Sequence, residues 1–276
     1  MIQEYGIFTI YFMVISFIIG TVMGSFINCL AWRTVSGESV LKGRSHCPQC
    51  SHLLKWVDLV PIFSFVSLKG QCRYCGKEIP VRYILTELFT GIIFLAIVLK
   101  SGPTWETLKE MVLVCILVTL SLVDFDTFEI PDGFILAGVV NWVITVPLVS
   151  GYIGPKWMVY NHIQWPISFM KHYVKSGLLA GFILALGMLA MSVVFDKLTG
   201  KESLGGGDIK LFFVIGLYTG IVQGVFCLLL SCVIGIIFSA VVKKNRIPFG
   251  PSISLAMCIT LLVGSRVANW YIHLIM

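Results

Sequence analysis

Residues 209–242 read IKLFFVIGLYTGIVQGVFCLLLSCVIGIIFSAVV, a run of 34 residues in which Lys210 carries the only charge. A membrane-spanning helix needs about 20 mostly apolar residues, so this run is long enough to cross a bilayer once or twice. Less apolar residues interrupt its middle, at Tyr218, Thr219, Gly220 and Gln223. The run therefore predicts two spans, 209–222 and 224–242, and their shared boundary is the least sharply marked in the chain.

The composition of the whole chain agrees with a membrane protein. Of its 276 residues, 57% are hydrophobic and only 12% are charged, and the mean hydropathy is +0.92. An average soluble domain has roughly a quarter charged residues, so this chain could not cover a water-facing surface. The composition excludes a soluble enzyme and a disordered, fibrous or secreted disulfide-rich protein.

Windows of comparable length and hydropathy recur along the chain, at 6–31, 83–99, 108–123, 134–150, 177–195 and 252–272. Together with the two windows already described, they are long enough for eight straight or tilted crossings. The predicted fold class is an all-α polytopic membrane protein with about eight transmembrane helices. The first window has no basic n-region and is too long for a signal peptide, so we expect a permanent first span.

The loops differ in their content of lysine and arginine, which accumulate on the cytoplasmic side of membrane proteins. With the N-terminus outside, the cytoplasmic connections hold 14 of the 20 basic residues. These connections are 33–82, 124–132, 196–208 together with Lys210, and 243–251. The net charge of +6 is then a signal of topology and does not indicate nucleic-acid binding. Both termini are expected outside.

One cytoplasmic loop, residues 33–82, is polar, basic and large enough to fold as a small domain. It contains two C-x-x-C pairs, formed by Cys47, Cys50, Cys72 and Cys75. Two such pairs can present four thiolates in a tetrahedron, which predicts a structural zinc site. Two disulfides are the alternative, and the reducing cytosol disfavours them. His46 and His52 flank the first pair, but four cysteines already complete a site, so we expect the histidines to be bystanders.

Four carboxylates lie within nine residues after the third predicted span, at Asp124, Asp126, Glu129 and Asp132. Their loop has no lysine or arginine to neutralise them. Carboxylates at a membrane edge are costly and usually mark a functional site. A solvated loop is the alternative. Glu129 and Asp132 could also be structural, since Asp132 lies where it could cap the helix that follows Pro131.

A second acidic site begins at a glycine run, where Gly205, Gly206 and Gly207 precede Asp208 and Lys210. Glycines allow another chain to approach the backbone closely. The predicted topology puts Asp124 and Asp208 at the same edge of the membrane. Two adjacent carboxylates can share a proton, so that one activates a water and the other polarises a peptide carbonyl, as in aspartic proteases. The spacing leaves Asp126 as a competitor for the role of Asp124.

Other functions are less well supported by the sequence. The chain has no G-x-S-x-G elbow and no H-E-x-x-H pair, and no histidine is expected near the carboxylates. An ion- or proton-coupled transporter is the alternative function, because transporters also combine paired carboxylates with broken helices. A transporter would place these carboxylates near the midplane, whereas Asp124 and Asp208 are expected at the inner edge.

Taken together and in this order, the motifs resemble those of the type IV prepilin peptidases, also called leader peptidase–methyltransferases. The resemblance covers nearly the whole chain. It rests on residues 24–28 (GSFIN), 44–50 (RSHCPQC), 70–75 (GQCRYC), 82–83 (RY), 87–88 (EL), Asp124 with 130–132 (IPD), 205–211 (GGGDIKL) and 248–251 (PFGP).

The resemblance implies a membrane aspartic endopeptidase that cleaves the short basic leader of a type IV prepilin or pseudopilin after a glycine, at the cytoplasmic face. The family's catalytic pair falls on Asp124 and Asp208, which favours Asp124 over Asp126. The glycine run and Lys210 would support the loop that meets the substrate. The implied location is the bacterial cytoplasmic membrane, in contact with lipid. No nucleic-acid partner is implied, and the oligomeric state is left open.

The resemblance also implies methyl transfer from S-adenosylmethionine to the new N-terminus. We expect the cytoplasmic domain and the adjoining ends of the first two spans to carry it, with Asn28 and Glu87 as candidates. An amide in a span is more often a packing contact, whereas a lone carboxylate is more often functional. The expected domains are a first transmembrane helix at 1–32, a four-cysteine zinc domain at 33–82 and a seven-helix membrane peptidase domain at 83–276.

Overall fold

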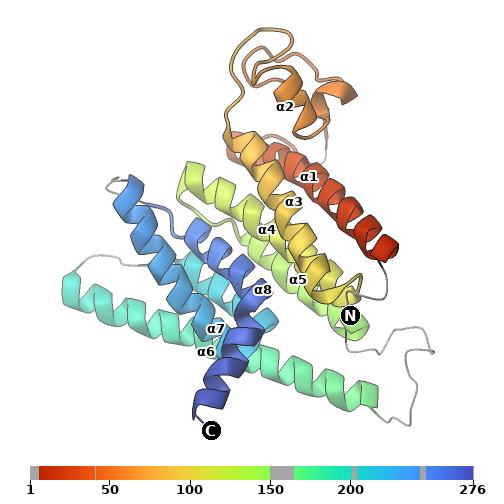
Figure 1. Cartoon of the computed structure of the whole chain (residues 1–276). Helices are drawn as coiled ribbons and strands as arrows, with labels where there is room; N and C mark the ends of the chain where they lie inside the picture. Colours follow the sequence, from red (N-terminus) through yellow and green to blue (C-terminus); the bar gives the residue numbers. More distant parts are fainter. Residues whose placement is uncertain (1–5, 41, 150–164, 201–203, 243–246, 276) are drawn as a thin grey trace. The chain divides into compact units, whose positions relative to one another are not determined.

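The computed structural model describes residues 6–40, 42–149, 165–200, 204–242 and 247–275. Over these residues the chain is built of helices, and extended backbone pairs only in two isolated bridges. The all-α fold class predicted from the sequence is confirmed (Figure 1). The chain divides into two compact units, Met1–Pro103 and Thr104–Met276.

The first unit is built on two long helices, α1 (Gly6–Ser36) and α3 (Arg82–Ser101), which pack against each other. Glycine makes this close approach possible. A Cβ atom added at Gly24 would lie 2.6 Å from the Cα atom of Glu87 on the other helix. Small residues at such positions are a common means of bringing membrane helices together. The pairing of the first two predicted spans therefore depends on backbone contact.

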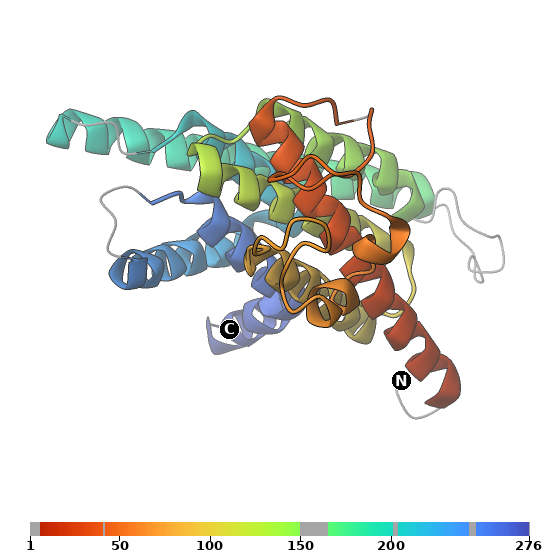
Figure 2. The same ribbon diagram turned by 90° about the horizontal axis from the view of Figure 1, so that it is seen from above.

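Between α1 and α3 the chain forms a small domain, which Figure 2 shows from above. It contains two short helices, η1 (Trp56–Leu59) and α2 (Phe63–Ser67), and one isolated bridge beside each C-x-x-C pair. Neither short helix has a buried residue, so packing alone gives this domain little stability. The contacts group this loop with both flanking spans, and the domain boundaries expected at residues 32 and 82 stay a prediction.

The second unit has five long helices in its described part: α4 (Trp105–Thr127), α5 (Asp132–Val149), α6 (Trp165–Thr199), α7 (Gly206–Val242) and α8 (Gly250–Ile275). Helix α7 packs against α5, α6 and α8, and α4 packs against α5 and α8. Thr104 caps the start of α4, since its hydroxyl accepts the N–H of Thr107 at 3.2 Å, and Phe128 caps its end in the left-handed conformation.

Helix α7 contains both spans predicted at 209–222 and 224–242, and Gly220 divides them. The φ of 71° and ψ of −175° at Gly220 are not helical, so the helix is kinked there. One turn earlier α7 lies directly against α6, where a Cβ atom added at Gly216 would be 2.5 Å from the Cα atom of Gly181. The kink falls among the interrupting residues that predicted the boundary.

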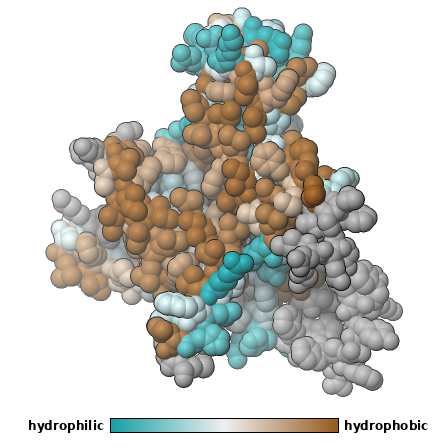
Figure 3. Space-filling view, in the orientation of Figure 1, coloured by the Kyte–Doolittle hydropathy of each residue, from teal (hydrophilic) through white to brown (hydrophobic). Residues whose placement is uncertain are grey.

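Six helices in the described part of the chain are long and apolar enough to cross a membrane: α1, α3, α5, α6, α7 and α8. On the face shown in Figure 3, apolar residues cover much of the surface of the helices. Helix α4 covers the third predicted span, 108–123, but its ends are rich in charged residues. Each of the eight predicted windows falls on a helix, and the multi-pass membrane architecture agrees with the prediction.

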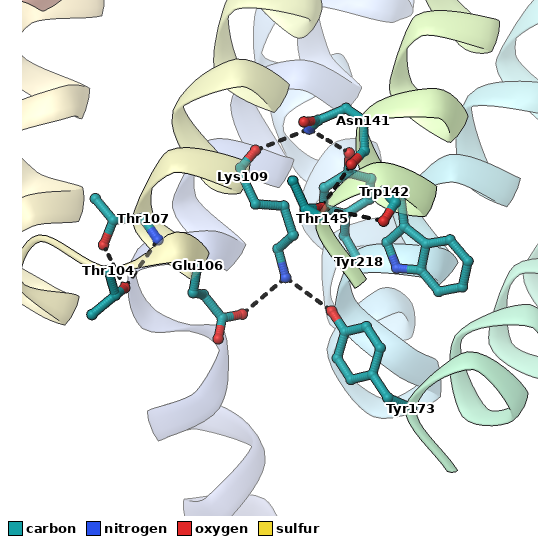
Figure 4. Close-up of polar contacts among 9 residues, drawn as sticks. All are labelled: Thr104, Glu106, Thr107, Lys109, Asn141, Trp142, Thr145, Tyr173 and Tyr218. Atoms are coloured by element: carbon teal, nitrogen blue, oxygen red, sulfur yellow. Dashed lines mark hydrogen bonds and ion pairs between the residues drawn. The ribbon is translucent and has the colours of Figure 1, made fainter. Parts of the chain in front are cut away.

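A buried lysine near the start of α4 links four helices of the second unit (Figure 4). Lys109 is only 2% exposed, and its ammonium group donates to the carboxylate of Glu106 and the hydroxyl of Tyr173, both at 2.9 Å. The rings of Tyr173 and Tyr218 lie 5.5 and 5.7 Å from the same nitrogen. The amide of Asn141 donates to the backbone carbonyl of Lys109 at 3.1 Å. These contacts connect α4 to α5, α6 and α7.

Candidate active site and metal centre

Asp124 lies near the C-terminal end of α4 and is only 4% exposed. Its Oδ2 accepts the backbone N–H of Gly250 at 2.9 Å. Gly250 is the first residue of α8, where the N–H groups have no partner within the helix, so this helix end is suited to hold a carboxylate. A Cβ atom added at Gly250 would lie 2.6 Å from the same Oδ2, so a larger residue there would displace the carboxylate.

Asp208 lies in the first turn of α7 and is half-buried. Its backbone N–H donates to the carbonyl of Gly205 at 3.1 Å. Its carboxylate is close enough to Asp124 for the charge of Asp124 to act on it. The two predicted catalytic carboxylates therefore lie within electrostatic reach of each other, with Asp124 buried and Asp208 partly exposed.

The three glycines before Asp208 have different surroundings. A Cβ atom added at Gly207 would lie 2.7 Å from the Cβ of Ile130, so the start of α7 packs directly against the turn between α4 and α5. A Cβ at Gly205 would lie 3.4 Å from the Oδ2 of Asp208, and Gly206 has open space around it. Gly207 is needed for packing, while Gly205 and Gly206 leave the approach to Asp208 open.

The other charged residues at and after the end of α4 and at the start of α7 are exposed. Lys210 forms an ion pair with Asp132 at 2.6 Å, which joins the first turns of α7 and α5. Because both side chains are exposed, this pair stabilises the fold by about 1 kcal/mol or less. Asp126 and Glu129 are also exposed. Asp124 is therefore the buried carboxylate of this group, and residues two apart on a helix point to different sides.

The cysteines of the two C-x-x-C pairs come together in the first unit. Their sulfur atoms all lie within 4.8 Å of one another, and none of them forms a disulfide. Four thiolates that bind zinc in a tetrahedron have sulfur atoms separated by roughly 3.8 Å. The cluster therefore has the donor set and the size of a four-cysteine zinc site, with the predicted members Cys47, Cys50, Cys72 and Cys75.

Both C-x-x-C pairs adopt the same turn. The N–H of Ser51 donates to the carbonyl of Cys47 at 2.8 Å, and that of Gly76 donates to Cys72 at 2.9 Å. Ser51 and Gly76 have positive φ values of 55° and 69°. Burial raises the pKa of Cys72, but hydrogen bonds from two backbone N–H groups and the neighbouring thiols lower it by more. The net result is a pKa of about 7, below the usual value for a thiol. This thiol therefore ionises readily, as a metal ligand must.

The histidines beside the first pair make other contacts. The Nε2 of His46 lies 3.7 Å from the carboxylate of Glu38, and its ring packs edge-on against Trp32. His52 stacks on the ring of Tyr74 with 3.7 Å between ring centroids. Among the described residues, the group of candidate ligands contains the four cysteines and neither histidine. This agrees with their expected role as bystanders.

Asn28 and Glu87 are both buried in the first unit and both make contacts within it. The Asn28 amide donates to the carbonyl of Tyr83 at 3.1 Å, which is the packing contact between α1 and α3 considered above. Glu87 accepts the backbone N–H of Ile62 at 2.7 Å and also a hydrogen bond from Ser25. Glu87 therefore holds the loop that connects η1 to α2, a contact that the sequence did not predict.

These features define a multi-pass membrane protein. Its first unit contains a four-cysteine domain, and its second unit contains the two candidate carboxylates. Family comparisons match both units. Residues 18–101 match the bacterial peptidase A24 N-terminal domain, and residues 111–240 match the type IV leader peptidase family. The chain belongs to the type IV leader peptidase family.

Several curated relatives are similar over most of their length. The prepilin leader peptidase/N-methyltransferase of Aeromonas salmonicida (strain A449) is 31% identical over 240 residues, which cover 84% of this chain and 76% of the relative. The protein of the same name from Bacillus subtilis (strain 168) is 29% identical over 270 residues, covering 94% and 98%. No solved structure matches the chain. The family resemblance of the motifs is confirmed.

Proposed function

We propose that this chain is a membrane aspartic endopeptidase that removes the leader peptide of a type IV prepilin or pseudopilin. The observation that carries the proposal is the buried Asp124, held by the N–H of Gly250 and within electrostatic reach of Asp208. The relatives named prepilin leader peptidase/N-methyltransferase support the reaction class. None of the comparisons supports the transporter alternative.

One of the two carboxylates acts as the general base and the other as the general acid. Two adjacent carboxylates share one proton, because both cannot ionise cheaply. The N–H of Gly250 stabilises negative charge on Asp124, so we assign Asp124 as the ionised base and Asp208 as the carrier of the proton. This is the arrangement that aspartic proteases use to hydrolyse a peptide bond.

The reaction follows from these assignments. Asp124 takes a proton from a water molecule whose oxygen attacks the scissile carbonyl carbon, while Asp208 donates its proton to the carbonyl oxygen. The tetrahedral intermediate then collapses: the C–N bond breaks, the proton on Asp124 passes to the leaving amine, and one hydroxyl of the intermediate returns a proton to Asp208 as the carbonyl forms again. The open space at Gly206 would admit the extended peptide next to Asp208.

The location of the reaction follows from the charge distribution. In the predicted topology, 14 of the 20 lysines and arginines lie in the connections on the same side of the membrane as the two carboxylates. Because basic residues accumulate on the cytoplasmic side, the site is assigned to the cytoplasmic face of the bacterial cytoplasmic membrane. The leader of a prepilin would meet the site there, with cleavage after its glycine, while the apolar helix of the substrate stays in the lipid.

Substitution of either carboxylate tests the peptidase. Asp124→Asn and Asp208→Asn should each abolish cleavage of a co-expressed cognate prepilin, because neither amide can act as base or acid. Mass spectrometry of the pilin reports the cleavage. The exposed Asp126→Asn is the matched control and should process prepilin almost normally. If Asp126→Asn abolishes cleavage and Asp124→Asn does not, the base has been assigned to the wrong carboxylate.

The first unit is proposed to carry methyl transfer and a structural zinc. The four cysteines would hold the zinc, which would stabilise a domain whose short helices bury no side chain. The methyl donor would be S-adenosylmethionine, as the relatives' designation as N-methyltransferases suggests. Glu87 is the candidate residue for methyl transfer. It would act either through its charge or by positioning the loop whose Ile62 N–H it binds.

Two substitutions of Glu87 separate these roles. Glu87→Gln keeps an acceptor for the N–H of Ile62 but removes the charge, whereas Glu87→Leu removes both. If the charge serves methyl transfer, both variants should release cleaved but unmethylated pilin, and mass spectrometry shows the missing methyl group. If only Glu87→Leu loses methylation, Glu87 positions the loop. Normal methylation in both variants would remove Glu87 from the reaction.

A further inference from the structure

The short helices of the four-cysteine domain expose a group of large apolar side chains. Trp56 is 78% exposed, Phe63 is 65% exposed, and Leu59 and Val66 are exposed as well. Together these residues of η1 and α2 form what we call the 56–66 apolar surface. A loop in water would not keep so many large apolar groups on its surface without a partner.

One hydrogen bond connects this surface to the membrane helix α3. The backbone N–H of Ile62, between η1 and α2, donates to the carboxylate of Glu87 at 2.7 Å. Glu87 lies five residues into α3, which begins at Arg82, and is thus about 7.5 Å along the helix from its start. This bond therefore ties the junction of the two short helices to the first turns of the span.

The carboxylate of the same segment, Asp58, is neutralised by residues of the four-cysteine domain. The side chain of Asp58 in η1 is only 4% exposed and pairs with Arg73 at 2.6 Å. It also accepts the hydroxyl of Tyr74 at 3.0 Å. The one carboxylate of η1 is thus turned towards the second C-x-x-C pair, so it does not oppose contact of the outer side with an apolar medium.

The surroundings of the surface fit lipid. Exposed lysines flank it at Lys55 and Lys69, where they can meet phosphate groups. Val81 and Leu85 at the start of α3 are exposed too, so apolar surface continues onto the span. In Figure 3 polar residues gather at the far end of this domain, and apolar residues lie between them and the helices.

We propose that residues 56–66 are an interfacial segment that sits in the headgroup layer of the leaflet at the start of α3, with Trp56 and Phe63 against the acyl chains. Aromatic side chains with neighbouring lysines favour this layer. Contact with lipid would hold the four-cysteine domain against the membrane, in addition to its two chain connections.

Photo-crosslinking in the full-length protein tests this proposal. The photoreactive residue p-benzoylphenylalanine is placed at position 56 or 63, and the protein is reconstituted in vesicles of phosphatidylethanolamine and phosphatidylglycerol. Position 92, exposed on the membrane helix α3, is the control for lipid contact, and the exposed position 78 in the second C-x-x-C loop is the control for water. Zinc content confirms that each variant is folded.

We expect lipid adducts at positions 56 and 63 in a yield similar to that at position 92, and none at position 78. A yield at 56 and 63 as low as that at 78 would overturn the proposal. Crosslinks from both positions to residues 104–276, or only to added prepilin, would also overturn it, because the surface would then bind protein. Two independent positions guard against a single poorly folded variant.

Discussion

At the scale of single residues, Gly250 determines how Asp124 is held. Its N–H binds the carboxylate, and a Cβ atom there would lie 2.6 Å from Oδ2 and 3.3 Å from Leu120 Cδ2. At Gly250 the backbone of α8 thus lies directly against side chains of α4. A carboxylate that must meet both a water and a substrate carbonyl depends on such fixed geometry.

Gly250→Ala should therefore slow cleavage strongly in a protein that still folds. The added methyl group must displace either Asp124 or the start of α8. Overpacking of this kind costs about 1–3 kcal/mol of stability, whereas a shift of the base of about 1 Å can lower the rate roughly 100-fold. Initial rates of prepilin cleavage in detergent, together with unfolding in a denaturing detergent, measure the two effects separately.

Gly133→Ala is the matched control for this substitution. Gly133 is also in the first turn of a helix, α5, but a Cβ atom there would meet nothing within 4 Å. This variant should keep both rate and stability. Equal rates for Gly250→Ala and the natural protein would show that the glycine contact does not position Asp124.

At the scale of the helices, the Lys109 cluster connects the second unit at the N-terminal end of α4. A fully buried ammonium is costly unless charge and hydrogen bonds compensate it. Here one carboxylate, one phenol hydroxyl and two aromatic rings surround it (Figure 4). The cluster fixes where α5, α6 and α7 meet α4, and so contributes to the placement of the helix that carries Asp124.

Lys109→Met should destabilise the second unit by about 1.5–3 kcal/mol, because it removes hydrogen bonds that involve a charge. Methionine fills similar space, so a cavity is not the cause. Unfolding in mixed micelles measures the loss. Lys171→Met on α6 is the control, since Lys171 is exposed and such changes usually stay within about 0.5 kcal/mol. A Lys109→Met variant as stable as the control would mean that the cluster contributes no net stability.

At the scale of the whole molecule, the spans, the cysteine cluster and the acidic segments could be predicted because each is marked by residues close together in the sequence. Apolar runs of sufficient length predicted the helices, and the interruption at residues 218–223 predicted a boundary between two spans where the structure has the kink of α7 at Gly220. The C-x-x-C spacing predicted the cysteine cluster. Burial separates Asp124 from Asp126, a choice that the spacing alone had left open and that the family resemblance favoured.

The contacts that the sequence did not predict join residues far apart in the chain. Gly250 and Asp124 are 126 residues apart, and Ile62 and Glu87 are 25 apart. Lys109 near the start of an apolar run resembles a lysine that reaches to the headgroups, yet it is fully buried. Hydrophobic periodicity reports which face of a helix is apolar, but it does not report which backbone N–H group will meet a carboxylate on another helix.

The division into two units predicts that loss of metal affects one reaction before the other. The purified protein should contain about one zinc per chain, and the double variant Cys72→Ser, Cys75→Ser should contain none, because two ligands cannot hold the ion in the closed tetrahedral site. The variant should lose methyl transfer, since the domain that loses its zinc lies in the first unit.

Cleavage should persist in the same variant, because both carboxylates and Gly250 belong to the second unit, whose helices pack among themselves. Elemental analysis and mass spectrometry of processed pilin check the two outcomes. Cys232→Ser, at an exposed cysteine of α7, should change neither zinc content nor activity. Zinc retained in the double variant would place the metal elsewhere, and a metal-free natural protein with full methylation would rule out a structural zinc.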